Sequence, residues 1–290
     1  MNVHSESVKA IAKKDFQDAV RSYLFWGLSF FFFTLMVSMA AGLWYFEGDV
    51  FAEATTEGLV SIGFNVTRLI LPLIALALGW KAIAGERSSG SIKVLLSLPH
   101  SRTDMMIGKL VGRSAVLSLS LVIGFLLAAI FVFGFLGTFD LTDYLGLLVM
   151  SVVYGVAYTS LAITVSSLTK STKFAAAGAF GIFVLFYIMW EAIMMTLVML
   201  VQFEYLPDSD RMIEFILFFN SLDLGTAFSN SLIMATSVAE LGEEVEQILE
   251  VFYDGSLPFY VQDWWGLVVM ALWLVVPFAI AIYRFEQIDL

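Results

Sequence analysis

Residues 23–46 read YLFWGLSFFFFTLMVSMAAGLWYF, a run of 24 residues without a charged side chain. A helix of about 20 apolar residues is long enough to cross the hydrocarbon core of a bilayer. Further stretches of this kind follow at 58–80, 114–139, 144–169, 174–203 and 264–283. Two of them carry one charge each, Arg68 and Glu191. The sequence therefore predicts six spans in an all-α polytopic membrane protein.

The composition of the 290-residue chain supports this class. Hydrophobic residues make up 60% of the chain and charged residues 14%, and the mean hydropathy is +0.88. Soluble proteins average about 45–50% apolar and about 25% charged residues. The absence of cysteine and the presence of only two histidines argue against disulfides and against thiolate or histidine metal sites. The net charge of −11 argues against a nucleic-acid partner.

The basic residues indicate how the six spans are oriented. Of the 15 Lys and Arg residues, 13 fall on the side of the two termini, and Arg68 and Arg211 fall on the other side. Basic residues collect on the cytoplasmic side of membrane proteins. We therefore expect a multi-pass protein of the plasma membrane with both termini cytoplasmic. The opposite face is acidic, as expected of a solvated surface and also of a high-salt habitat such as that of haloarchaea.

The stretch 204–263 is predicted to be an external region of short helices before the last span. Residues 215–239 are apolar enough to resemble a seventh span. In that case Asn220, Asp223 and Asn230 would lie at mid-membrane, where polar groups are costly. Residues 241–252 have the spacing of an amphipathic external helix.

Residues 1–22 are predicted to form an amphipathic cytoplasmic helix, ahead of a transmembrane domain of residues 23–285 and a tail of residues 286–290. Its apolar stripe consists of Val8, Ile11, Ala12, Phe16, Ala19 and Val20. Such a stripe is expected to lie among acyl chains at the membrane interface, with the lysines near anionic headgroups of the bilayer. The simpler alternative is a frayed start of the first span.

The loop of residues 81–113 is far longer than a reversal of the chain requires. A short apolar face formed by Ile92, Leu95, Leu96 and Leu98 ends at Pro99. Ser101 and Asp104 then have the spacing of a capping box at the start of the third span. A short apolar helix on a charged hairpin is suited to dock into a groove of a soluble partner. A hairpin that lies in the membrane interface is the alternative.

Three stretches carry a family resemblance. They are IAGERSSGSIKVLLSLPHSRTDMMIGKLVGR at 83–113, AIAKKDFQDAVRS at 10–22 and LWLVVPFAIAIYRFEQIDL at 272–290. The first resembles the cytoplasmic loop of ABC-type export permeases of the second class, especially the NosY-like branch of prokaryotes. The second resembles the elbow helix of that family, and the third its last span and tail.

The resemblance implies that the chain pairs with a second copy of itself or with a sister permease. Each permease would dock on an ATP-binding subunit, which holds the ATP and Mg²⁺. The residues that match the coupling loop of the family are Glu86, Arg87, Gly90, Leu95, Leu96, Pro99 and Arg102, and Ile92 belongs to the same apolar face.

The chain itself has no phosphate-binding motif of the form GxxxxGKS/T, because the stretch GKLVGRS at 108–114 does not fit it. We therefore expect no catalytic site and no cofactor in this chain.

Glu191 is the acidic residue predicted to lie well inside a span, at the depth of the outer leaflet. An intramembrane carboxylate is a candidate for function. We expect it to pair with Arg68, and the two residues are candidates for the transport pathway. The alternative is an interfacial glutamate that reaches external water.

The leading function is the permease subunit of an exporter that moves an unidentified substrate outward. A non-transporting scaffold or sensor linked to the maturation of an extracytoplasmic enzyme is the alternative. An intramembrane enzyme is less favoured, since its nucleophile–base pair, metal site or acid dyad is missing from the spans. Met189, Met194, Met195 and Met199 would suit Cu(I), but packing is the ordinary role of methionine.

Overall fold

The computed structural model describes residues 4–21, 23–46, 54–92, 101–207, 209–238 and 258–287. Within these ranges the regular structure is helical, apart from one isolated β-bridge between Thr55 and Thr138. The predicted all-α class is confirmed. The helices are α1 (Ser5–Val20), α2 (Tyr23–Tyr45), α3 (Thr56–Gly79), α4 (Ala84–Ser89), α6 (Arg102–Phe135), α7 (Leu141–Leu168), α8 (Thr172–Val184), the π-helix η1 (Leu185–Met189), α9 (Trp190–Gln202), α10 (Asp210–Ser221), α11 (Leu224–Ala235) and α13 (Asp263–Glu286).

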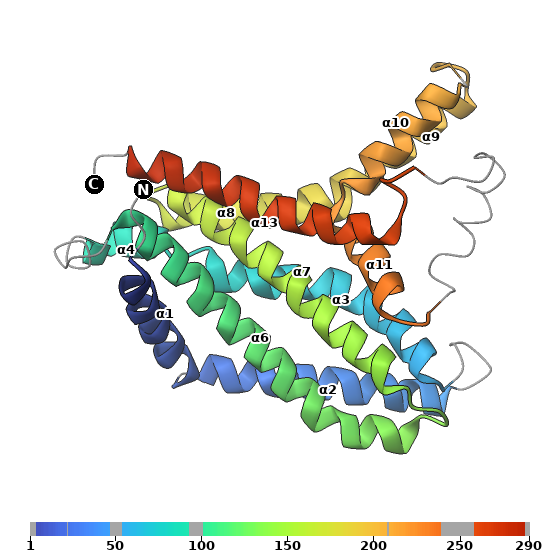
Figure 1. The fold of residues 1–290 in the computed structure, drawn as a ribbon, viewed down its shortest axis with the longest axis horizontal. Coiled ribbons are helices and arrows are strands. Elements are labelled where there is room, and N and C mark those ends of the chain that lie inside the picture. The colour runs from blue at the N-terminus through green and yellow to red at the C-terminus, as the bar shows by residue number, and fades with distance from the viewer. Residues whose placement is uncertain are drawn as a thin grey trace.

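Six segments of the described chain are long and apolar enough to cross a membrane, as predicted. They are α2, α3 with α4, α6, α7, the run from α8 through η1 to α9, and α13. Figure 1 shows both termini at one end of the bundle, together with α4. An even number of crossings brings the termini to the same end.

The start of α6 shows how the local sequence sets a helix end. Ser101 Oγ accepts a hydrogen bond from Asp104 N at 3.0 Å, and Asp104 Oδ2 accepts one from Ser101 N at 3.1 Å. This is the predicted capping box, which satisfies backbone donors that have no partner within the helix. Because α6 has 34 residues, or about 51 Å, it extends well beyond a bilayer core of about 30 Å.

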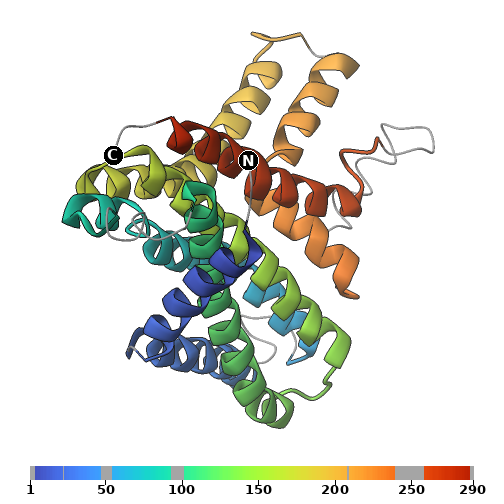
Figure 2. The same ribbon diagram turned by 60° about the vertical axis from the view of Figure 1, so that its left-hand side comes forward.

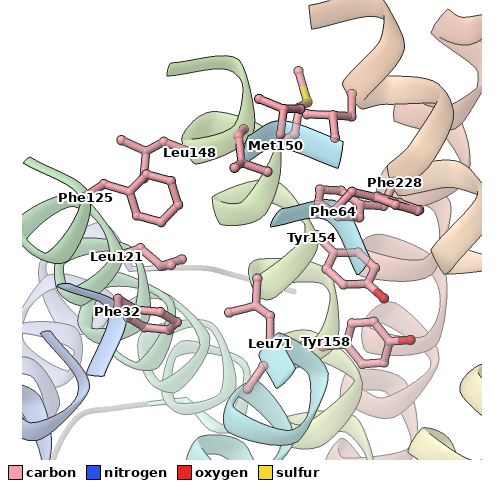
Figure 3. Close-up of a cluster of buried hydrophobic side chains, with 14 of the residues drawn as sticks. Phe32, Phe64, Leu71, Leu121, Phe125, Leu148, Met150, Tyr154, Tyr158 and Phe228 are labelled. Carbon is pink, nitrogen blue, oxygen red and sulfur yellow. The ribbon is translucent and has the colours of Figure 1, made fainter. Parts of the chain in front are cut away.

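The core of the bundle is built around α7, the most buried of the spans. Phe228 of α11 stacks on Tyr154 of α7 and on Phe64 of α3, with ring centroids 4.5 and 5.5 Å apart (Figure 3). On the other side of the cluster lie Phe125 of α6 and Phe32 of α2 (Figure 3). Helix α11 is therefore part of the packed bundle.

The stretch 204–263 contains two helices that meet at a sharp break. Helix α10 lies beside α9 where both project from the bundle (Figures 1 and 2). Helix α11 turns by 83° from α10 and packs against α13 and α7. Figure 1 shows that α13 begins at the end of the bundle opposite to the termini. Helix α11 packs against α13 near this end. The amphipathic helix predicted at 241–252 lies outside the described residues.

Helix α1 packs along α6. A Cβ atom at Gly108 would lie 2.8 Å from the side chain of Ile11, and one at Gly112 would lie 2.9 Å from Asp15 Cβ. Small residues four positions apart allow two helices to approach this closely. Ile11 and Ala12 are buried as a result. Ile11 and Ala12 of the predicted stripe are thus covered by protein, since amphipathic spacing does not show which apolar surface covers a helix.

Candidate functional site

Helix α4 carries two of the predicted coupling residues and is anchored to the end of α7. The buried Ser166 Oγ accepts hydrogen bonds from Ile83 N and Ala84 N, both at 3.0 Å. At its other end the helix stops at Gly90, whose φ of 78° is in the left-handed region that glycine adopts most readily. The predicted residue Gly90 thus has a conformational role at the start of the hairpin.

Arg87 binds the carboxyl-terminal end of α7. Its Nη1 donates hydrogen bonds to the carbonyl oxygens of Ser167 at 2.9 Å and Thr169 at 3.3 Å. The last carbonyls of a helix have no partner within the helix and carry the negative end of its dipole. The Arg87 guanidinium also lies 5.8 Å from the ring centroid of Phe285 in α13. Arg87 therefore joins α4 to two spans.

Arg102 makes the corresponding contact with α13. Its Nη1 donates hydrogen bonds to the carbonyl oxygens of Phe285 at 3.0 Å and Glu286 at 3.2 Å. The neighbouring Thr103 Oγ1 donates a hydrogen bond of 2.6 Å to Glu286 Oε1. The start of α6, where the hairpin ends, is fixed in this way to the last turn of α13.

A buried ionic cluster links α1, α4 and α6. Lys109 Nζ lies 3.1 Å from Asp15 Oδ1 and 2.6 Å from Glu86 Oε1. Arg113 Nε lies 2.9 Å from Asp15 Oδ2. The side chains of Asp15 and Lys109 are only 6% and 10% exposed, so both depend on partners within the cluster for compensation of their charges. We call these four residues the Lys109 cluster.

The predicted coupling residues thus divide into two groups. Glu86, Arg87 and Arg102 contact the protein's own helices, and Ile92 is buried in an apolar cluster with Met105 and Met106. Leu95, Leu96 and Pro99 lie outside the described residues. The charged residues Glu86, Arg87 and Arg102 thus attach the two ends of the hairpin, α4 and the start of α6, to the bundle.

Sequence reasoning missed Asp15, Lys109 and Arg113. One signal was present, since Asp15 interrupts the apolar stripe of α1 between Ile11 and Ala19 at helical spacing. A charged residue inside an apolar stripe indicates a buried partner of opposite sign.

A second ionic cluster lies towards the other end of the bundle. Arg68 Nη2 of α3 lies 2.5 Å from Glu191 Oε1 of α9, so the predicted pair is confirmed. Arg68 Nη2 also lies 3.6 Å from Asp223 Oδ2, at the break between α10 and α11. The Asp223 side chain is 2% exposed, whereas that of Glu191 is 59% exposed. Sequence reasoning had treated Asp223 merely as an obstacle to a seventh span.

The surroundings of Arg68 fit its guanidinium closely. A Cβ atom at position 225 would collide with the guanidinium, so Gly225 leaves the space that the side chain fills. Tyr154 Oη donates a hydrogen bond of 3.3 Å to the Arg68 carbonyl oxygen. Glu191 is the second residue of α9, which begins directly after the π-helical turn η1, a type of turn often found at functional sites. With two carboxylates around one guanidinium, the cluster has a formal charge of −1.

The described residues include no group of three or more His, Asp or Glu side chains arranged to hold a metal ion. The methionines of α9 and η1 do not converge either. Met194 packs against the core, whereas Met189, Met195 and Met199 are exposed. Three of the four thus lie on the outer surface of the helix, where methionine is an ordinary apolar residue.

The six spanning helices of the described chain and the long loop fastened to them define a polytopic α-helical membrane protein. The chain belongs to the ABC-2 family transporter protein family, which it matches over residues 9–290. It is 28% identical over 227 residues to the "Probable ABC transporter permease protein NosY" of Pseudomonas aeruginosa, covering 75% of this chain and 79% of that protein. A protein of the same name from Stutzerimonas stutzeri is 27% identical over 221 residues, covering 74% and 78%. The protein is thus the membrane permease subunit of an ABC transporter, a type of subunit that is typically not itself catalytic.

Proposed function

We propose that this permease exports its substrate across the plasma membrane, using ATP that is bound with Mg²⁺ and hydrolysed by a separate ATP-binding subunit. The partner docks on the hairpin of residues 81–113, and both termini are cytoplasmic. The strong excess of basic residues on the side of the termini supports this orientation. A second copy of the chain, or a sister permease, completes the transporter. The sparsely buried span Thr172–Gln202 supports such a pairing.

The observation that carries the proposal is the attachment of both ends of the hairpin, helix α4 and the start of α6, to the spans around them. Arg87 binds the end of α7, Arg102 binds the end of α13, and Glu86 binds Lys109 of α6. A force applied to the hairpin by the ATP-binding subunit would therefore reach these spans through the hydrogen bonds and the ion pair of Arg87, Arg102 and Glu86. This is the mechanical requirement for coupling ATP hydrolysis to a rearrangement of the bundle.

Deletion of residues 92–98 is expected to abolish association with the ATP-binding subunit. In the sequence these residues lie between Arg87 and Lys109, whose described contacts hold the two ends of the hairpin. The measurement is co-purification of the ATP-binding subunit with tagged permease, followed by the ATPase rate of the complex in lipid vesicles.

A deletion of equal length in the external region, residues 242–248, is the matched control and should leave association intact. Retention of the ATP-binding subunit by the 92–98 deletion would refute the docking role of the hairpin. Association without any change in ATPase rate would favour the scaffold function over transport.

Glu191→Gln is expected to leave assembly intact and to lower the permease-stimulated ATPase rate severalfold. Since Glu191 is 59% exposed, its ion pair contributes about 0–1 kcal/mol to stability, and the unfolding temperature should change little. The charge of the cluster changes from −1 to 0, which alters any step in which the pair opens. The measurement compares ATPase rate and unfolding temperature in the reconstituted complex.

Glu214→Gln is the control, because Glu214 is an exposed glutamate of the neighbouring α10. An unchanged ATPase rate for Glu191→Gln would remove Glu191 from the transport pathway and leave it as an interfacial residue.

A further inference from the structure

An apolar groove of about 170 Å³ runs between α3 and α8. Its lining includes Leu73, Ala77, Trp80, Ala176, Phe180 and Phe183. Pockets for drug-sized ligands usually measure about 300–1,000 Å³ and contain a few polar groups. This groove is smaller and apolar, which suits a segment of hydrocarbon chain.

The groove extends along the spans. Trp80 lies at the end of α3 and Ala176 near the start of α8, both at the end of the bundle where α4 and the termini lie (Figure 1). Leu73 and Phe183 lie seven residues further along each helix, which corresponds to about 10 Å. The groove therefore covers part of one leaflet, and in the proposed orientation this is the cytoplasmic leaflet.

Lysines lie next to residues that line this end of the groove. Lys81 Nζ lies 4.5 Å from the centroid of the Trp80 ring, and Lys173 lies one turn before Ala176 on α8. Lys170 stands next to Thr169, whose carbonyl oxygen Arg87 holds beside α4. All three lysines are exposed. Across the described part of the chain, none of them forms an ion pair with a carboxylate.

We propose that this groove is a binding site for an anionic phospholipid, with one acyl chain between α3 and α8 and the headgroup phosphate at Lys81 and Lys173. An acyl chain gains little from the hydrophobic effect when it leaves the bilayer for an apolar groove, because lipid tails are equally apolar. Selectivity must therefore come from the lysines. Basic pockets between spans bind anionic headgroups, and each basic residue near the membrane surface favours an anionic lipid by about fivefold.

Native mass spectrometry of the full-length protein in detergent tests the proposal, with phosphatidylglycerol and phosphatidylcholine of identical acyl chains as probes. The first lipid bound should be phosphatidylglycerol, preferred by about tenfold or more. The double substitution Lys81→Gln and Lys173→Gln should lower this preference by about 25-fold, about fivefold for each lysine. The matched control, Lys13→Gln with Lys14→Gln, removes two exposed lysines of α1 and should retain it.

Ala77→Leu provides an independent test, because Ala77 lines the groove and faces outward, so the larger side chain fills the groove without entering the core. It should weaken binding of the first lipid of either kind. An unchanged preference in the Lys81/Lys173 variant, an equal loss in the Lys13/Lys14 control, or unchanged binding in Ala77→Leu would overturn the proposal. A change of oligomeric state in Ala77→Leu would instead assign the groove to contact with a second copy.

Discussion

Lys109→Met is expected to weaken the attachment of α1 and α4 to α6 and to uncouple the permease from its ATP-binding subunit. The substitution leaves Asp15 with Arg113 alone and leaves Glu86 without its partner at 2.6 Å. Removal of one member of a buried ion pair costs about 3–5 kcal/mol, and the remaining Arg113 together with the 21% exposure of Glu86 places this case at about 3 kcal/mol. The measurements are the free energy of unfolding in detergent and the ATPase rate of the reconstituted complex.

Two variants make the test specific to the Lys109 cluster. Lys109→Arg retains the positive charge and should recover most of the stability and the ATPase rate. Lys13→Met removes an exposed lysine of α1 and should change neither. If Lys109→Met behaved as the wild type in both measurements, the cluster would have no part in holding the hairpin.

Arg68→Met is expected to destabilise the permease by about 3–5 kcal/mol. The Asp223 side chain is 2% exposed and would lose the guanidinium that compensates its charge. The substitution would also leave empty the space that Gly225 provides for the guanidinium. Because Asp223 caps α11, its uncompensated charge would destabilise the start of this helix, whose Phe228 stacks on Tyr154. Unfolding in detergent measures the loss.

A second substitution distinguishes the unpaired charge from lost packing. Asp223→Asn in the Arg68→Met background removes the buried charge but still accepts the capping hydrogen bond from Thr226 N, so stability should recover in part. Arg211→Met, an exposed arginine of α10, is the matched control. Equal stability of the single and double variants would show that the Asp223 charge contributes nothing.

The sequence was sufficient to predict the spans because their physical cause is local. In lipid, a charge-free run such as 23–46 can pair its backbone N–H and C=O groups within its own segment only as a helix. This requirement holds whichever segments pack against it. The capping box of Ser101 and Asp104 likewise needs only four adjacent residues. The pairing of Arg68 with Glu191 was within reach too, since two opposite charges at similar depth in neighbouring spans have few other partners.

The Lys109 cluster could not be predicted in the same way. Asp15, Glu86 and Lys109 lie on three segments of the sequence, and their meeting depends on how closely α1 approaches α6. That approach is set by Gly108 and Gly112, which the sequence presents only as part of a failed phosphate-binding motif. The break at Asp223 is similar, because the 83° turn results from the packing of α11 against α7 and α13.

The π-helical turn η1 sets the direction in which Glu191 points. A π-turn accommodates one residue more than an α-helical turn, and one residue corresponds to about 100° of rotation about the helix axis. If the surplus residue moved past Glu191 along the span, the carboxylate would swing away from Arg68 while α8 stayed in place. The ion pair between Arg68 of α3 and Glu191 of α9 therefore depends on how far α9 is rotated about its own axis. Movement of the surplus residue past Glu191 is enough to change that rotation.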